Sequence, residues 1–127
     1  MAARLAKTRY YLGIAKAVAQ RSPCLKMKVG AVLVKHDAVI STGYNGPARG
    51  EKHCKVCVRK KLSTGSAYTK DCPAVHAEEN AIINAAREGH STVGAVLYLW
   101  TSKGPLEPCY RCEREIINAG IVDVIIA

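Results

Sequence analysis

Two short segments carry residues that can bind a metal ion and act on water: HAE at 76–78 and PCYRC at 108–112. One imidazole and two thiolates are three zinc ligands, which leave the fourth tetrahedral position open, as catalytic zinc sites require. The two cysteines lie three residues apart, so that both sulfur atoms face one side of a helix that begins there. The N-terminus of that helix favours thiolate over thiol. The sequence therefore predicts zinc ligands at His76, Cys109 and Cys112, and a proton carrier at Glu78.

Four further cysteines, Cys24, Cys54, Cys57 and Cys72, are candidates for a second metal site. Because the chain shows no export signal, a disulfide framework is not expected. Four thiolates suit a closed, structural zinc site. Three of these cysteines lie in the stretch 43–75, which has no clean periodicity and needs something to hold it. We therefore expect two zinc ions per chain, with His53 as an alternative ligand of the second.

Two other interpretations of the cysteines remain open. A CxxC pair can belong to a thioredoxin-like redox site, although two pairs beside an HxE segment fit a metal better. Alternatively, Cys54, Cys57, Cys109 and Cys112 could hold one zinc in a ribbon-like nucleic-acid binding module. That module would have no catalysis and no use for Glu78. The zinc content separates the two, since a ribbon needs one ion per chain.

The composition favours one globular domain with an anionic partner. The 127 residues suffice for a single core, and 19 Lys and Arg face 10 Asp and Glu, for a formal net charge of +9. Such a balance suits nucleic acid or a phosphorylated metabolite, and the stretch 52–61 could contact nucleic acid. No apolar run approaches the ~18 residues of a membrane span, so we expect no membrane partner and a cytoplasmic location.

The periodicity of apolar residues predicts an α/β domain over 1–127 with a central sheet. The elements expected in chain order are a helix over 4–19, strands over 29–34 and 38–42 joined as a hairpin, a helix over 76–88, a strand over 93–100, a helix over 109–119 and a buried strand over 121–127. In this order, both metal-binding segments begin helices at one edge of the sheet. We therefore expect the two segments to form one metal site.

Several segments together resemble the deoxycytidylate (dCMP) deaminase family, within the zinc-dependent cytidine/deoxycytidylate deaminase superfamily. They are RSPC at 21–24, VGAV at 29–32, ISTGYNG at 40–46, HAEENAI at 76–82, AAREG at 85–89 and PCYRC at 108–112. The resemblance implies a three-layer α/β/α fold with a central mixed sheet. It also implies zinc-dependent hydrolysis of dCMP to dUMP and ammonia. Because HAE and PCxxC occur throughout the superfamily, a tRNA or other nucleic-acid deaminase and a free-nucleoside deaminase remain alternatives.

The resemblance also implies roles for residues outside the metal site. The expected substrate-binding residues are Asn45 at the sugar, Tyr44 beside it, Ala77, and Lys26 and Lys28 as candidates for the phosphate. The expected regulatory residues are Gly43, Asn45 and Arg87, at which dCTP would activate and dTTP inhibit. Members of the family assemble as homo-oligomers, often hexamers. The connection over 100–107 is longer than is usual in the family, so we expect a different pocket wall.

Overall fold

The computed structural model describes residues 3–59 and 71–127. Its elements are α1 (Lys7–Ala19), β1 (Val29–Lys35), β2 (Ala38–Tyr44), β3 (Gly46–Pro47), β4 (Ala74–Val75), α2 (Ala77–Arg87), β5 (Val96–Thr101), α3 (Tyr110–Asn118) and β6 (Asp123–Ile126). None of the helices in these ranges has the length and apolar character that crossing a bilayer would need.

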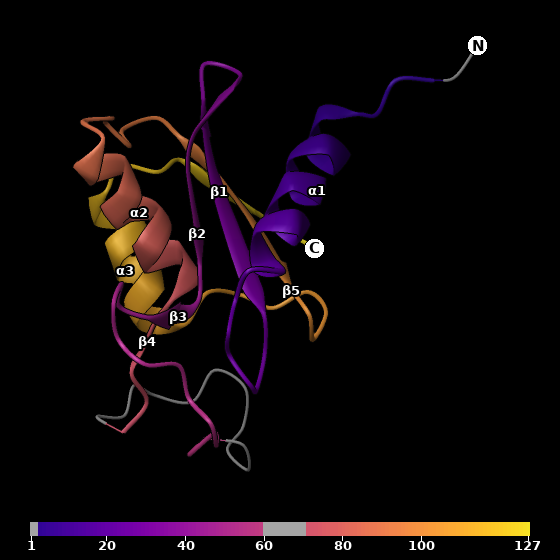
Figure 1. Ribbon diagram of the computed structural model, residues 1–127. Coiled ribbons are helices and arrows are strands. Elements are labelled where there is room, and N and C mark those ends of the chain that lie inside the picture. The colour runs from indigo at the N-terminus through magenta and orange to yellow at the C-terminus, as the bar shows by residue number, and fades with distance from the viewer. Residues whose placement is uncertain (1–2, 60–70) are drawn as a thin grey trace.

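The main sheet has four strands in the order β2-β1-β5-β6 (Figure 1). β1 pairs antiparallel with both β2 and β5, whereas β5 and β6 are parallel and are connected through α3. The sheet is therefore mixed, as expected. The β1–β2 hairpin turns at His36 and Asp37, whose φ angles of 52° and 58° are typical of a two-residue type I′ turn.

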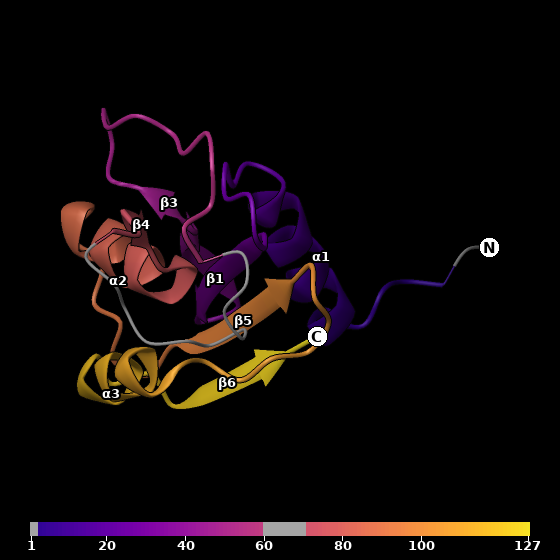
Figure 2. The same cartoon turned by 90° about the horizontal axis from the view of Figure 1, so that it is seen from below.

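The domain has three layers, because α1 covers one face of the sheet while α2 and α3 cover the other (Figures 1 and 2). On the α1 face, the core consists of Tyr11, Ala15, Val32, Val34 and Tyr98. On the opposite face, alanines of α2 and Ile116 of α3 pack on Ala31, Leu33, Leu97 and Leu99. Alternate residues of β1 and β5 thus point to opposite cores. The predicted α/β/α architecture is confirmed.

Two glycines allow the helices to approach the sheet closely. A Cβ atom at Gly30 of β1 would lie 2.0 Å from the carbonyl oxygen of Ala15 in α1. A Cβ atom at Gly43 of β2 would lie 2.3 Å from the backbone nitrogen of Ala81 and 2.5 Å from the carbonyl oxygen of Ala77, both in α2. These distances are far below van der Waals contact. Gly43 therefore fixes how closely the helix that carries Glu78 lies against β2.

The predicted elements all form, with differences at their ends. α1 begins at Lys7, three residues later than expected. β5 begins at Val96 because Gly94 adopts a left-handed conformation (φ 85°), which ends the extended stretch predicted from residue 93. The prediction that the last strand is buried is wrong. β6 is an edge strand with one neighbour, and its side chains are partly buried or exposed. The short β3–β4 pair was not predicted.

Candidate metal centre and active-site pocket

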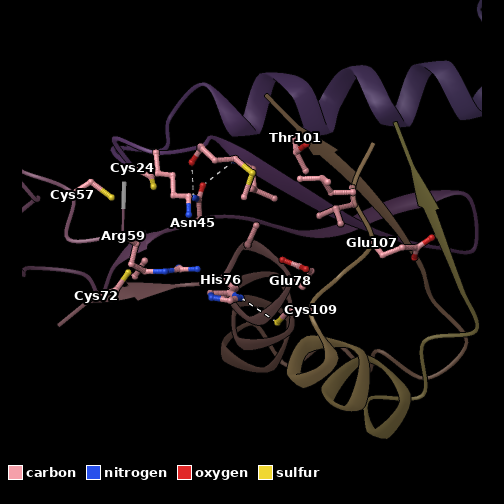
Figure 3. A pocket seen from close by; sticks show the side chains of 17 residues that line it. Cys24, Asn45, Cys57, Arg59, Cys72, His76, Glu78, Thr101, Glu107 and Cys109 are labelled. Carbon is pink, nitrogen blue, oxygen red and sulfur yellow. Dashed lines mark hydrogen bonds between the residues drawn. The ribbon is translucent and has the colours of Figure 1, made fainter. Parts of the chain in front are cut away.

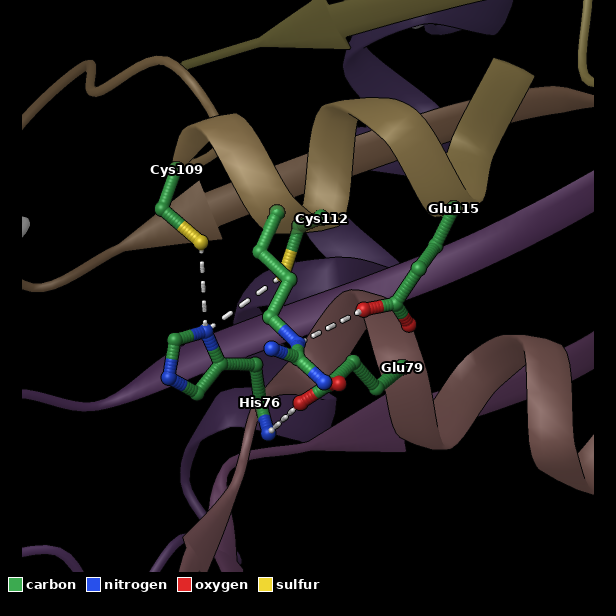
Figure 4. A network of polar contacts seen from close by, with 6 residues as sticks. His76, Glu79, Cys109, Cys112 and Glu115 are labelled. Atoms are coloured by element: carbon green, nitrogen blue, oxygen red, sulfur yellow. Dashed lines mark hydrogen bonds and ion pairs between the residues drawn. The ribbon is translucent and has the colours of Figure 1, made fainter. Parts of the chain in front are cut away.

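The three predicted zinc ligands meet where two helices begin. His76 is the residue that caps the N-terminus of α2, and Cys109 caps that of α3. His76 Nδ1 lies 3.6 Å from Cys109 Sγ and 3.4 Å from Cys112 Sγ (Figure 4). All three ligand atoms lie within 4.8 Å of one another. One imidazole and two sulfurs at these separations fit tetrahedral zinc with one position left for water or substrate.

The surroundings of the ligands favour the forms that bind metal. Burial is the main cause that lowers the pKa of His76, so the neutral imidazole predominates near pH 7. Glu79, in the first turn of α2, accepts a hydrogen bond from the backbone N–H of His76 at 3.0 Å and so fixes the start of the helix (Figure 4). Cys109 and Cys112 lie at the start of α3, where the free backbone N–H groups carry a partial positive charge.

Glu78 lies beside this centre and is almost completely buried, with 6% of its surface exposed. Burial is the main cause that raises its pKa above the usual value for a glutamate. A carboxyl group with a raised pKa can both accept and donate a proton near neutral pH, as a general acid and base must. The side chain lines the same pocket as His76 and Cys109 (Figure 3).

This pocket has a volume of about 180 Å³. Its wall comes from the start of β1, the end of β5, the N-terminus of α2, the loop before α3 and the cysteine-rich segment, which includes Cys54, Cys57, Arg59 and Cys72 (Figure 3). Leu106 and Glu107 of that loop belong to the wall. The long connection over 100–107 therefore forms part of the pocket wall.

Some of the predicted substrate-binding residues line this pocket and others do not. Asn45 and Ala77 both line it, whereas Tyr44 is 37% exposed and is not one of the described lining residues. The amide of Asn45 donates a hydrogen bond to the carbonyl oxygen of Met27 (2.8 Å) and accepts one from the backbone N–H of Val29 (2.9 Å). Asn45 thus holds the segment that enters β1 and forms part of the pocket wall.

Of the two lysines predicted to bind the phosphate, only one lines the pocket. Lys26 lines the pocket, but Lys28 does not and instead donates a hydrogen bond to the carbonyl oxygen of Ser22 at 3.2 Å. Arg59 also lines the pocket, close to His76 (Figure 3). No motif marks Arg59 in the sequence, because the segment around it has no periodicity. Its place in the pocket wall depends on the course of the backbone, which a sequence motif does not show.

The four remaining cysteines all line a second, smaller cavity of about 40 Å³. None of them forms a disulfide bond. Their sulfur atoms are not gathered as tightly as the His76 centre, which is the one cluster of metal-binding groups in ranges 3–59 and 71–127. All four cysteines thus share the second cavity, whereas Cys109 and Cys112 group with His76. This arrangement argues against the ribbon, in which the two CxxC pairs share one ion.

Comparison with protein families decides the class of this chain. The family described as "Cytidine and deoxycytidylate deaminase zinc-binding region" matches residues 5–127. The chain belongs to this family. Its zinc-binding character agrees with the His/Cys/Cys centre, and the family is one of enzymes.

Relatives of this deaminase-family chain include proteins of very different length. A deoxycytidylate deaminase of Mycobacterium phage D29 is 43% identical over 122 residues, which cover 91% of this chain and 90% of the relative. The deoxycytidylate deaminase of Schizosaccharomyces pombe is 38% identical over 119 residues, which cover 91% of this chain but only 35% of the relative. The match therefore spans nearly all of the phage protein and about a third of the yeast protein.

Solved structures show the same fold. The crystal structure of dCMP deaminase from the cyanophage S-TIM5, in complex with dCMP and dUMP, has a TM-score of 0.76 and 26% identity, and the match covers 97% of this chain and 82% of that one. A cytidine deaminase from Burkholderia pseudomallei has a TM-score of 0.65 at 21% identity and shares the fold. The predicted resemblance to the deaminase superfamily is confirmed.

Proposed function

We propose that this chain catalyses the hydrolytic deamination of dCMP to dUMP, with release of ammonia. The observation that carries the proposal is the convergence of His76, Cys109 and Cys112 beside the buried carboxyl group of Glu78 in one pocket. The three side chains would hold the zinc ion. When bound, zinc acts as a Lewis acid that makes water available as a nucleophile near neutral pH.

Glu78 would carry the protons of the reaction. The carboxylate takes a proton from the attacking water and passes it to the ring nitrogen of cytosine, next to the carbon that is attacked. The proton that remains on the added oxygen then passes through Glu78 to the departing amino group, which leaves as ammonia while the added oxygen becomes the carbonyl oxygen of uracil. Because burial raises the pKa of Glu78, the carboxyl group can hold the proton between these two transfers. The position of Glu78 two residues after His76 keeps it beside the reacting carbon.

Three features support dCMP as the substrate. The ISTGYNG segment at 40–46 resembles the dCMP deaminase family and places Asn45 in the pocket wall. The pocket contains Lys26, a cation suited to a phosphate group. The phage and yeast relatives are named deoxycytidylate deaminases, and the cyanophage enzyme binds dCMP and dUMP. We propose that Asn45 and Ala77 contact the nucleoside, with Tyr44 supporting them and Lys28 near the phosphate.

The test is an ammonia-release screen of the zinc-loaded protein over cytosine, cytidine, deoxycytidine, dCMP and dCTP. We expect the largest kcat/KM for dCMP. A phosphate held by charge-assisted hydrogen bonds should separate dCMP from deoxycytidine by at least about tenfold. Equal values for dCMP and cytidine would instead indicate a free-nucleoside deaminase. A faster reaction on a tRNA anticodon stem would indicate a nucleic-acid deaminase.

We further propose that residues 1–127 form a single domain with a second, structural zinc bound by Cys24, Cys54, Cys57 and Cys72. The shared cavity that these four side chains line supports this ligand set, and His53 is the alternative ligand. Closing the cysteine-rich segment around an ion would add metal-binding energy to folding. The count of two zinc ions per chain, and a cytoplasmic location, belong to this proposal.

Regulation is the last part of the proposal. By resemblance to the family, the chain would form a homo-oligomer, such as a hexamer, that dCTP activates and dTTP inhibits. Gly43 and Asn45 lie at the end of β2 and just after it, and Arg87 is the exposed last residue of α2. The helix α2 connects Arg87 with Glu78. A change at the Arg87 end could therefore reach the catalytic carboxyl group through one rigid element.

A further inference from the structure

Arg59 places a permanent positive charge in the wall of the active-site pocket. The residue follows Cys57 in the cysteine-rich segment, and its side chain extends toward His76 (Figure 3). The Nε atom of Arg59 is shielded from solvent. The arginine is also close enough that its charge contributes to lowering the pKa of His76. Arg59 is thus part of the pocket and not a solvated surface arginine.

A guanidinium group in this place is suited to one kind of ligand. Its planar set of N–H donors matches the oxygens of a phosphate and can form two parallel hydrogen bonds. A shielded arginine holds a phosphate more strongly than an exposed lysine does, because solvent screens the interaction less. Lys26 lines the same pocket and adds a second cation. The metal centre and Glu78 would act on the base, which leaves the phosphate for the cationic wall.

We propose that Arg59 binds the 5′-phosphate of the substrate and thereby selects a nucleotide over a nucleoside. This inference rests on the proposed function and assigns its specificity to one residue. A competing role is structural: Arg59 could balance the negative charge of the cysteine cluster, since Cys24, Cys57 and Cys72 line the same pocket. The two roles differ in one respect. Only phosphate binding makes the loss of Arg59 depend on whether the ligand carries a phosphate.

The experiment compares Arg59→Gln and Arg59→Lys with the parent protein, all loaded with zinc, on dCMP and on deoxycytidine. For Arg59→Gln we expect kcat/KM for dCMP to fall by about 10- to 100-fold, mostly through KM, which is the effect of losing hydrogen bonds to a charged group. The value for deoxycytidine should stay within about twofold. Arg59→Lys should retain part of the preference for dCMP. The control is Arg9→Gln, an exposed arginine of α1 on the opposite side of the sheet, which should change neither value.

Equal losses on both substrates would overturn the proposal in favour of the structural role, as would an unchanged value for dCMP. Binding provides a second test that does not depend on turnover. Calorimetry should show that Arg59→Gln weakens dUMP at least about tenfold and leaves deoxyuridine unchanged. The parent protein could bind dUMP and yet not deaminate dCMP, which would refute the proposed function. The calorimetric comparison of dUMP with deoxyuridine would still test the role of Arg59. Equal weakening of both ligands, or of neither, refutes the role of Arg59.

Discussion

The carboxyl groups of Glu79 in α2 and Glu115 in α3 interact, and Glu79 raises the pKa of Glu115. Burial is the main cause that raises the pKa of Glu115 to about 7, and the carboxyl group of Glu79 is the second. Nε of Arg111 lies 3.8 Å from a carboxylate oxygen of Glu115, and the positive charge of Arg111 opposes this shift. Two carboxyl groups that lie close together are favoured when one of them keeps its proton. The two carboxyl groups belong to the helices that begin at His76 and at Cys109.

The first prediction concerns the stability of this pair as a function of pH. The pKa of Glu115 lies near 7 in the folded protein but near 4.5 when the chain is unfolded. The folded state therefore loses stability as the pH rises from about 4.5 to about 7. Glu115→Gln keeps the shape of the side chain but cannot ionise beside Glu79. At pH 8 it should be more stable than the parent, by on the order of 1 kcal/mol after allowance for partial exposure.

Urea unfolding at pH 5 and pH 8 measures this effect. The relevant quantity is the difference between variant and parent, in which the pH dependence of zinc binding largely cancels. The control is Glu113→Gln, an exposed glutamate of the same helix, for which we expect no such pH-dependent gain. A Glu115→Gln variant less stable than the parent at pH 8 would contradict the assignment.

The second prediction compares two glycines with opposite surroundings. Gly43→Ala places a methyl group against the backbone of α2, at 2.3 Å from the nitrogen of Ala81, which cannot move without shifting the helix. We expect a loss of about 1–3 kcal/mol in the free energy of unfolding. Gly13 lies within α1 with no atom within 4 Å of where its Cβ would be, so Gly13→Ala should gain about 0.5–1 kcal/mol. Chemical denaturation measures both, and effects of the same sign would show that the packing argument is wrong.

The third prediction tests the second metal site. Cys57→Ser should lower the zinc content from two ions to one and should reduce stability, because the free energy of metal binding contributes to folding. Cys109→Ser should also lose one zinc ion, but it should abolish deamination, since it removes a ligand of the catalytic centre. Metal analysis of both purified variants, together with the ammonia assay, distinguishes the sites. Two tightly bound zinc ions in Cys57→Ser would exclude this cysteine as a ligand.

The catalytic centre could be predicted from the sequence because its geometry is local. His76 and Glu78 lie two residues apart at the start of a helix, and Cys109 and Cys112 lie three apart at the start of another. Helix geometry then determines which side chains face the same way. The topology needed only to place the two helix N-termini together.

The pocket wall could not be predicted in this way. Arg59 and Leu106 enter the pocket from segments without periodicity, so that their positions depend on the path of the backbone between elements. Asn45 could be identified by resemblance, but its hydrogen bonds to Met27 and Val29 depend on how β1 and β2 pair. The depth at which Gly43 packs on α2 depends on the distance between two layers, which no local pattern encodes.

The fourth prediction tests the chemistry of Glu78. Glu78→Gln keeps the shape of the side chain but cannot accept or carry the proton, so kcat for dCMP should fall at least about a hundredfold. Zinc content should be unchanged, since Glu78 does not bind the metal. Glu107→Gln is the matched control, because it removes an exposed carboxyl group from the same pocket and should cost far less. Turnover near the parent value in Glu78→Gln would rule out the mechanism.

The last prediction concerns Arg87 and regulation. Arg87 ends α2, whose 11 residues extend over roughly 15 Å at about 1.5 Å per residue and begin beside His76. A coupling of ~1–3 kcal/mol between effector and substrate would appear as sigmoidal dependence on dCMP that dCTP makes hyperbolic. Arg87→Gln should flatten this response and leave kcat at saturating dCMP within about twofold, because Arg87 is far from the pocket.

The alternative is that Arg87 only complements the C-terminal dipole of its helix. In that case Arg87→Gln would lower the free energy of unfolding by a few tenths of a kcal/mol. Its response to dCTP and dTTP would stay the same as that of the parent protein. Steady-state kinetics with each triphosphate, beside Arg9→Gln as an exposed control on another helix, decides between the two roles.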